Sequence, residues 1–333
     1  MGYSLDPAQP VTQSVRQVAL KEIDNAKRWL CDPDFHAGVH NARKCLKRLR
    51  SLLELIRPGI SEPLFDYLTD NLKDTAHQLA PARDVQALID TVEKMGKNSA
   101  ALSKGSALPE IRGWLDQRRS VVESRSQADP VAKALADLDA LRPQFAKLTV
   151  YPDNFEPIGE GLEQTYRATR KAADRAFKKK TDEALHDWRK HVQQHWRQLQ
   201  LLTPCWPETL GPRAEHVHSL AQLLGDDHDL SNLRRLLAAP AMSFGKSGDT
   251  KKLTKHCLKE QKGLRTEAKH LAARLFAEKP KTFLDRIEAH WQAIADRQKP
   301  DPQSGQQDAA PSEDDSEESN VLRFGKSDEW RVG

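Results

Sequence analysis

The chain has 333 residues, of which 30% are charged and only 6% are aromatic. This length allows two compact units of ordinary size, or one larger unit with a tail. No stretch of about 18 apolar residues is present, and the first residues resemble no signal peptide, so the sequence predicts neither a membrane span nor secretion. Its four cysteines include no Cys-x-x-Cys pair, which is typical of reduced thiols in a cytoplasmic protein.

The charge is unevenly distributed along the chain. Lys and Arg total 52 against 48 acids, but residues 300–333 hold nine acids and three bases, so the rest carries a net charge of +10. From Lys299 onward Gln, Ser, Pro, Asp and Glu predominate, and such a segment cannot bury enough apolar surface to fold. We therefore expect a basic body that attracts anions, followed by a disordered acidic tail at 299–333.

Helical periodicity, broken at proline and glycine, predicts an all-α fold with two sets of helices. The sets are separated by a break at Tyr151-Pro152-Asp153. Predicted helices cover residues 11–30, 34–57, 61–79, 82–94, 107–126 and 130–147, and then 158–178, 182–203, 207–224, 227–239, 250–278 and 281–297.

The second set of helices repeats the first. A shift of 145 aligns Asp84 with Asp229. A shift of 146 residues aligns His40 with His186, Arg43 with Arg189, Lys44 with Lys190, Leu53 with Leu199, Leu55 with Leu201 and Pro58 with Pro204. The repeat predicts two tandem helical bundles, at 11–148 and 155–298, related by a pseudo-two-fold axis.

The helix predicted at 34–57 has one apolar and one basic side when residues are placed about 100° apart. Glu54 is its only acid between His40 and Arg57, so the cations lack the partners at i+4 that usually neutralise such a surface. We therefore predict that this side binds an anion. Its basic residues are His40, Arg43, Lys44, Lys47 and Arg50.

The second copy of this helix has a similar but less charged face. Gln193 replaces the equivalent of Lys47, and Trp196 replaces the equivalent of Arg50. His195 falls on the apolar side, where we expect a hydrogen-bonded core histidine. The polar side carries His186, Arg189, Lys190 and Arg197.

A second basic helix precedes this one, at 158–178, and carries Arg170 and Lys171. Two basic helices could line a groove. Arginine offers a planar set of donors that matches phosphate oxygens, lysine a compact charge, and histidine a proton-dependent donor near neutral pH. A row of such residues is suited to a linear phosphate polymer.

Two other ligands share some of these features. Nucleic acid would engage the same charges through its backbone, but the sequence shows no recognition helix and no obvious platform for base stacking, so it is less favoured. A metal-dependent phosphohydrolase could use His186 with Asp187 and the run Asp226-Asp227-His228-Asp229. However, Asp226 and Asp227 follow Gly225, where we expect a helix to start, and so are better explained as capping residues.

The chain resembles the CHAD family, the conserved histidine α-helical domain. The resemblance spans nearly all of residues 11–297. The stretches that carry it are Val39-His40-Asn41-Ala42-Arg43-Lys44-Cys45-Leu46-Lys47-Arg48-Leu49-Arg50, Leu79-Ala80-Pro81-Ala82-Arg83-Asp84, Leu185-His186-Asp187-Trp188-Arg189-Lys190, Leu223-Leu224-Gly225-Asp226-Asp227-His228-Asp229-Leu230 and Leu275-Phe276-Ala277-Glu278-Lys279-Pro280-Lys281.

The resemblance implies a CHAD domain at 1–298, made of two four-helix bundles with a basic cleft between them. It also implies binding of inorganic polyphosphate, often at polyphosphate granules, without catalysis, cofactor, metal or membrane. The polyphosphate-binding residues that it indicates are His40, Arg43, Lys47, Arg50, His186, Arg189, Lys190 and Arg197, followed by Lys44, Arg48, Arg170 and Lys171.

Overall fold

The structure is a computed structural model that describes residues 2–126, 129–240 and 244–296. These described residues belong to one compact unit. The acidic tail predicted at 299–333 lies outside the described residues. No strand occurs among those residues, and none of their helices is both long and apolar enough to cross a membrane.

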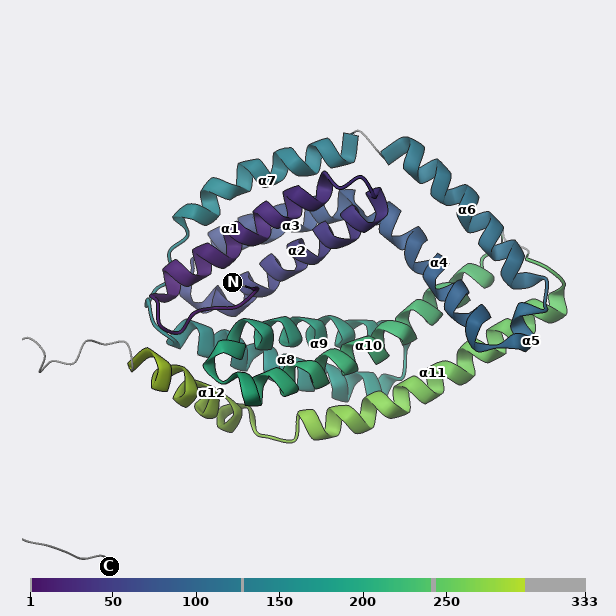
Figure 1. Cartoon of the computed structure of the whole chain (residues 1–333). Coiled ribbons are helices and arrows are strands. Elements are labelled where there is room, and N and C mark those ends of the chain that lie inside the picture. Colours follow the sequence, from purple (N-terminus) through teal and green to yellow (C-terminus); the bar gives the residue numbers. More distant parts are fainter. Residues whose placement is uncertain (1, 127–128, 241–243, 297–333) are drawn as a thin grey trace, which may run out of the picture. The chain divides into compact units, whose positions relative to one another are not determined.

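The predicted all-α fold is confirmed (Figure 1). Most predicted helices match the observed ones to within a few residues. The helices are α1 (Val11–Leu30), α2 (Phe35–Ile56), α3 (Glu62–Gln78), α4 (Ala80–Asn98), α5 (Ala100–Ser103), α6 (Ala107–Ser126), α7 (Asp129–Lys147), α8 (Glu156–Lys179), α9 (Asp182–Leu202), α10 (Pro207–Leu237), α11 (Ser247–Leu275) and α12 (Pro280–Ala295), with short 3-10 turns at Arg57–Gly59 and Thr203–Cys205.

The break predicted at Gly225 is wrong, because α10 runs through it without interruption. Asp226 and Asp227 therefore lie inside a helix and cap nothing. The Asp227 carboxylate is buried and accepts a hydrogen bond of 2.6 Å from Nε of Arg265 on α11. Asp226 forms an ion pair of 2.6 Å with Lys94 on α4. Tertiary partners on neighbouring helices thus account for both acids.

Helices α2 and α9 form the centre of the main core. Asp34 begins α2 by accepting hydrogen bonds from the backbone N–H groups of His36 and Ala37, and Thr181 caps α9 in the same way. The apolar side of α2, predicted from the sequence, is buried. The two halves of the chain share this core, since α2 packs against both α8 and α9. The predicted pseudo-two-fold relation between the halves remains a prediction.

The contact between α2 and α8 depends on a glycine. A Cβ atom at Gly161 would lie 2.0 Å from the carbonyl oxygen of Leu55, which is a backbone atom that cannot rotate away. Only glycine lets the two helix backbones approach this closely. The first and second halves of the chain are therefore held in direct backbone contact at this point.

A second, smaller hydrophobic cluster was not predicted. It joins α4 and α6 of the first half to the C-terminal part of α10 and the N-terminal part of α11 (Figure 1). Its most buried members are Ile89, Ile111, Leu115, Leu233, Leu253 and Cys257. The two halves are thus joined by two separate clusters of apolar side chains.

His195 lies in the main core, as predicted, but it is not hydrogen-bonded. Its side chain is fully buried against the rings of Tyr166, Phe276 and Phe283. Neither ring nitrogen has a hydrogen-bond partner among the described residues. Burial, and to a smaller extent the charge of Arg213, lower the pKa of His195 to about 3.

This pKa predicts a specific loss of stability in acid. The unfolded chain takes up a proton on His195 below about pH 6.5, whereas the folded chain does not until about pH 3, so stability falls as the pH decreases between these values. His195→Phe removes this term and should raise the Tm more at pH 5 than at pH 8. Thermal unfolding at both pH values measures the difference, with exposed His216→Phe as the control. An equal change at both values would contradict the assignment.

Candidate functional site

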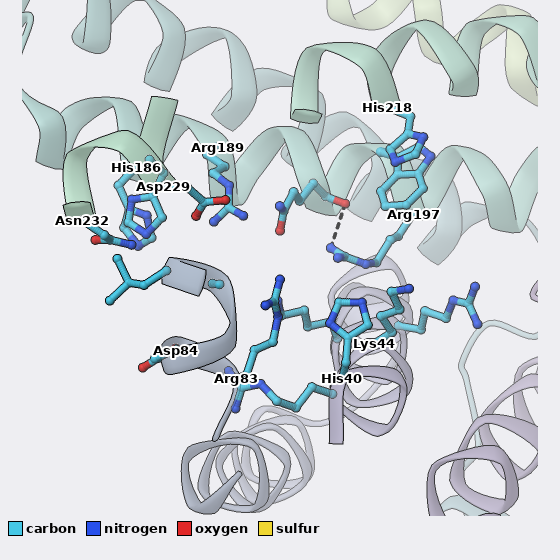
Figure 2. A pocket seen from close by; sticks show the side chains of 18 of the residues that line it. His40, Lys44, Arg83, Asp84, His186, Arg189, Arg197, His218, Asp229 and Asn232 are labelled. Carbon is cyan, nitrogen blue, oxygen red and sulfur yellow. Dashed lines mark hydrogen bonds between the residues drawn. The ribbon is translucent and has the colours of Figure 1, made fainter. Parts of the chain in front are cut away.

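A pocket of about 960 Å³ lies between α2, α4, α9 and α10 (Figure 2). Eight of its lining residues are arginine or lysine and four are histidine, against two aspartates, Asp84 and Asp229. It therefore has a large excess of positive charge. The basic residues are His40, Arg43, Lys44, Lys47 and Arg48 on α2, Arg83 on α4, His186, Arg189 and Arg197 on α9, and His218, His228 and Arg235 on α10.

The structure brings together most, but not all, of the predicted site residues. Those that line the pocket are His40, Arg43, Lys44, Lys47, Arg48, His186, Arg189 and Arg197. Those that do not line it are Arg50, Arg170, Lys171 and Lys190. Helix α8 contributes no residue to this pocket, so the groove expected between α8 and α9 is not part of it. The reason is that α8 packs on another side of α9, where Thr169 donates to the His191 carbonyl oxygen, and Arg170 donates instead to the carbonyl oxygen of Glu278.

The walls from α4 and α10 were not predicted as part of the site. They contribute Arg83, His218, His228 and Arg235, together with the two aspartates. One feature of the sequence could have identified these two helices. The repeat aligns Asp84 with Asp229, and an acid retained in both copies, as the basic helix is, indicates that the acid and the basic helix lie close together. The remaining residues are brought in by tertiary packing.

Neutral groups position several of the pocket arginines. The Arg43 guanidinium donates to the backbone carbonyl oxygen of Ala76 on α3. The Arg197 guanidinium donates to the carbonyl oxygen of Gln193 at 3.0 Å, and its Cζ lies 5.4 Å from the centre of the Trp196 ring. Such partners orient a guanidinium without cancelling its charge.

Aromatic side chains extend this support. The Trp196 ring stacks on His218 with centroids 4.1 Å apart and planes 6° from parallel. Tyr3 from the N-terminal segment contacts Arg48 twice, through its ring at 5.2 Å and through a 2.8 Å hydrogen bond from its hydroxyl to the Arg48 carbonyl oxygen. Arg48 also forms an ion pair of 3.4 Å with buried Glu22.

Most of the pocket cations form no close ion pair within the described residues, although Asp84 and Asp229 act electrostatically on Arg43 and Arg189. Besides Arg48, only Arg83 has an acidic partner within 4.0 Å in the described part of the chain, namely Asp90 at 3.5 Å. Among these residues no such ion pair is formed by Arg43, Lys44, Lys47, Arg189, Arg197 and Arg235. A bound anion would relieve their mutual repulsion.

The close packing of cations in the pocket lowers the pKa values of several of them. The walls of the pocket desolvate Lys47, and the charges of Arg197, Arg43 and Arg189 add to the effect, so its pKa falls to about 7. Burial lowers the pKa of Arg197 to about 10, against the opposing effect of Tyr3. Lys47 is therefore only partly protonated at neutral pH, although an ordinary lysine is fully charged.

Three of the pocket histidines, His40, His186 and His228, have lowered pKa values, which differs from the expectation of titration near neutrality. Desolvation, with Lys44 and Arg83, lowers the pKa of His40 to about 4. Burial lowers the pKa of His186 as well. His228 stacks on His186 with ring centroids 4.2 Å apart, and burial together with that ring lowers its pKa to about 4. Proton uptake by these rings would require a bound anion.

Three of the four acids considered as metal ligands are paired with cations on three different helices. Asp187 pairs with Arg175 of α8 at 3.0 Å, Asp226 with α4, and Asp227 with α11. Within the described ranges, no group of three or more His, Cys, Asp or Glu side chains is arranged to hold a metal ion. Of the residues in the phosphohydrolase alternative, His186, His228 and Asp229 thus line the pocket, whereas Asp187, Asp226 and Asp227 are held by cations elsewhere.

The all-helical fold and the basic pocket define a polyanion-compatible helical domain, and comparison with known proteins gives its family. Residues 17–238 match the family model of the CHAD domain. The chain therefore belongs to the CHAD family.

Individual relatives agree with this assignment. Two uncharacterized proteins, from two strains of Mycobacterium tuberculosis, are each 25% identical over 257 residues, which cover 72% of this chain and 48% of the relative. The chain thus spans about half the length of the curated relatives it matches. The crystal structure of the CHAD domain from the plant Ricinus communis is similar in fold, with a TM-score of 0.50 and 16% identity, over 87% of this chain and 94% of that one.

The lowered pKa of Lys47 predicts unusual reactivity. A neutral amine is the nucleophile, so an amine-selective acetylating reagent at pH 7.5 should modify Lys47 faster than the exposed Lys190. Arg197→Gln removes the strongest charged neighbour and should slow the reaction at Lys47 alone. Peptide mass spectrometry over time measures both rates. Equal rates at Lys47 and Lys190, or no response to Arg197→Gln, would contradict the assigned pKa.

Proposed function

We propose that this protein binds inorganic polyphosphate in the pocket between α2, α4, α9 and α10, without catalysing its reaction. The observation that carries the proposal is the set of six pocket cations without an acidic partner among the described residues. A polyphosphate chain carries a negative charge on every unit and could satisfy several of these cations at once. The alternative nucleic-acid ligand has the same kind of backbone charge but also carries bases.

The pocket offers little for those bases. Trp196 stacks on His218 and carries Arg197 against its ring, so its interactions are already made within the protein. The other groups that line the pocket are mainly guanidinium, ammonium, amide and imidazole groups, which suit phosphate oxygens. The family's description as polyphosphate-binding supports the same ligand.

A non-catalytic role is supported by the positions of the acids. Asp187, Asp226 and Asp227 are each engaged by a cation on a different helix, so they are not gathered to hold a metal ion or to activate water. Polyphosphate is stored in cells as granules, and we propose a cytoplasmic site of action at such granules.

Two arginines at equivalent positions of the repeat provide the test. Arg43→Ala and Arg189→Ala each remove a charge-assisted set of donors from the pocket, and each should weaken polyphosphate binding by about 1.5–3 kcal/mol. Titration of a fluorescently labelled polyphosphate measures the change, and circular dichroism confirms folding. The exposed Lys252→Ala serves as the control. An equal loss in this control would show that only net charge matters.

Competition against the same labelled polyphosphate distinguishes polyphosphate from nucleic acid as the ligand. Unlabelled polyphosphate should displace the probe at much lower phosphate concentration than single-stranded or double-stranded DNA does. If DNA competes as well per phosphate, the nucleic-acid alternative is correct and the proposed function is wrong.

A further inference from the structure

An exposed basic strip lies on α8 and α9, outside the pocket. Lys171, Arg175 and Lys178 follow one another on α8 at spacings of four and three, which places them on one face of the helix. Lys190 of α9 and Arg175 both act electrostatically on His191, and the side chains of all four cations are exposed. We call Lys171, Arg175, Lys178 and Lys190 the outer strip.

The outer strip begins at the rim of the pocket. His186 lines the pocket, and Lys190 lies one turn further along α9, close enough for its charge to add to burial in lowering the pKa of His186. The next residue after His186 is Asp187, which forms the 3.0 Å ion pair with Arg175 of α8. The surface thus passes from the pocket to α8 without an intervening helix.

Arg175 of α8 and Lys190 of α9 both act electrostatically on His191. Burial lowers the pKa of His191, and both Arg175 and Lys190 lower it further, so both cations lie within electrostatic reach of the same ring. The charges of α8 and α9 therefore face a common region of the surface.

Local stability does not explain these lysines. Lys178 in the last turn of α8 interacts favourably with the helix dipole, but Lys171 and Lys190 lie in helix interiors. Of the four strip residues, only Arg175 has an acidic partner within 4.0 Å among the described residues. Asp174 is an exposed acid on the same part of α8, and the four strip cations still leave a positive excess there.

We propose that the outer strip is a second subsite, which binds the part of a polyphosphate chain that extends beyond the pocket. This inference rests on the proposed function of the pocket. A chain held in the pocket has a high effective concentration at the adjacent strip, and every further phosphate contact releases counterions. The protein therefore binds long chains more tightly than short ones, by contacts that short chains cannot reach.

The test compares two variants that lose the same charge. The strip variant carries Lys171→Gln, Lys178→Gln and Lys190→Gln. The control variant carries Lys251→Gln, Lys255→Gln and Lys259→Gln, at exposed positions of α11, which lines no part of the pocket. Each protein is titrated with tripolyphosphate and with long-chain polyphosphate over a range of salt concentrations.

The strip variant should lose at least about tenfold in affinity for the long chain and keep its affinity for tripolyphosphate. The slope of log affinity against log salt concentration for the long chain should become less steep by about two, since each of the three lost phosphate contacts contributes roughly 0.7. The control variant should show neither change. Equal losses in both variants, or an equal loss for both ligands, would overturn the subsite.

Acetylation of the wild-type protein tests the outer strip independently of the variants. Long-chain polyphosphate should slow acetylation of Lys171, Lys178 and Lys190, whereas tripolyphosphate should slow acetylation only in the pocket. Protection of none of the three by the long chain would overturn the subsite while leaving the pocket intact. If wild-type protein binds neither ligand, the proposed function fails and the subsite fails with it.

Discussion

Repulsion among cations in the pocket is the constraint on which the structure depends. Arg43, Arg189 and Arg197 are held in one cavity with Lys47, and the described residues provide no acid within ion-pair distance of any of them. Backbone carbonyl groups and an aromatic ring orient two of these arginines while leaving their charge intact. Two separate hydrophobic clusters join the halves of the chain and oppose the repulsion. The fold thus holds a concentrated positive charge in place for an external anion.

The helices could be predicted from the sequence because their signals are local. The period of apolar residues places the faces of α2 and α9, and capping residues such as Asp34 mark where a helix begins. The break expected at Gly225 failed because a glycine weakens a helix by only about 1 kcal/mol, and tertiary contacts outweigh that preference. The second hydrophobic cluster could not be predicted from the sequence either, because it depends on which helices far apart in the sequence pack together.

The candidate site was predicted in part for the same reason. The basic faces of α2 and α9 follow from residue spacing, so His40, Arg43 and Arg189 could be predicted to lie together, and they line one pocket. The walls from α4 and α10 and the exclusion of Arg170 depend on packing between helices, which residue spacing does not encode. The pKa values could not be predicted either, because desolvation and neighbouring charges are properties of the assembled pocket. The proposed outer strip gives Lys171 and Lys190 a role beside the pocket, where the structure places them.

The most direct test of an uncompensated pocket is the number of protons taken up when polyphosphate binds. Isothermal titration at pH 7.5, in buffers of different ionisation enthalpy, measures this number with a long chain, whose internal phosphates do not titrate in this range. Lys47 has a pKa of about 7 in the free protein, and a bound polyanion should return it toward the ordinary value near 10.4. Binding should therefore take up a proton, and Lys47→Arg, which keeps the charge but does not titrate, should abolish most of the uptake. Binding without uptake, or with release of protons, would contradict the account.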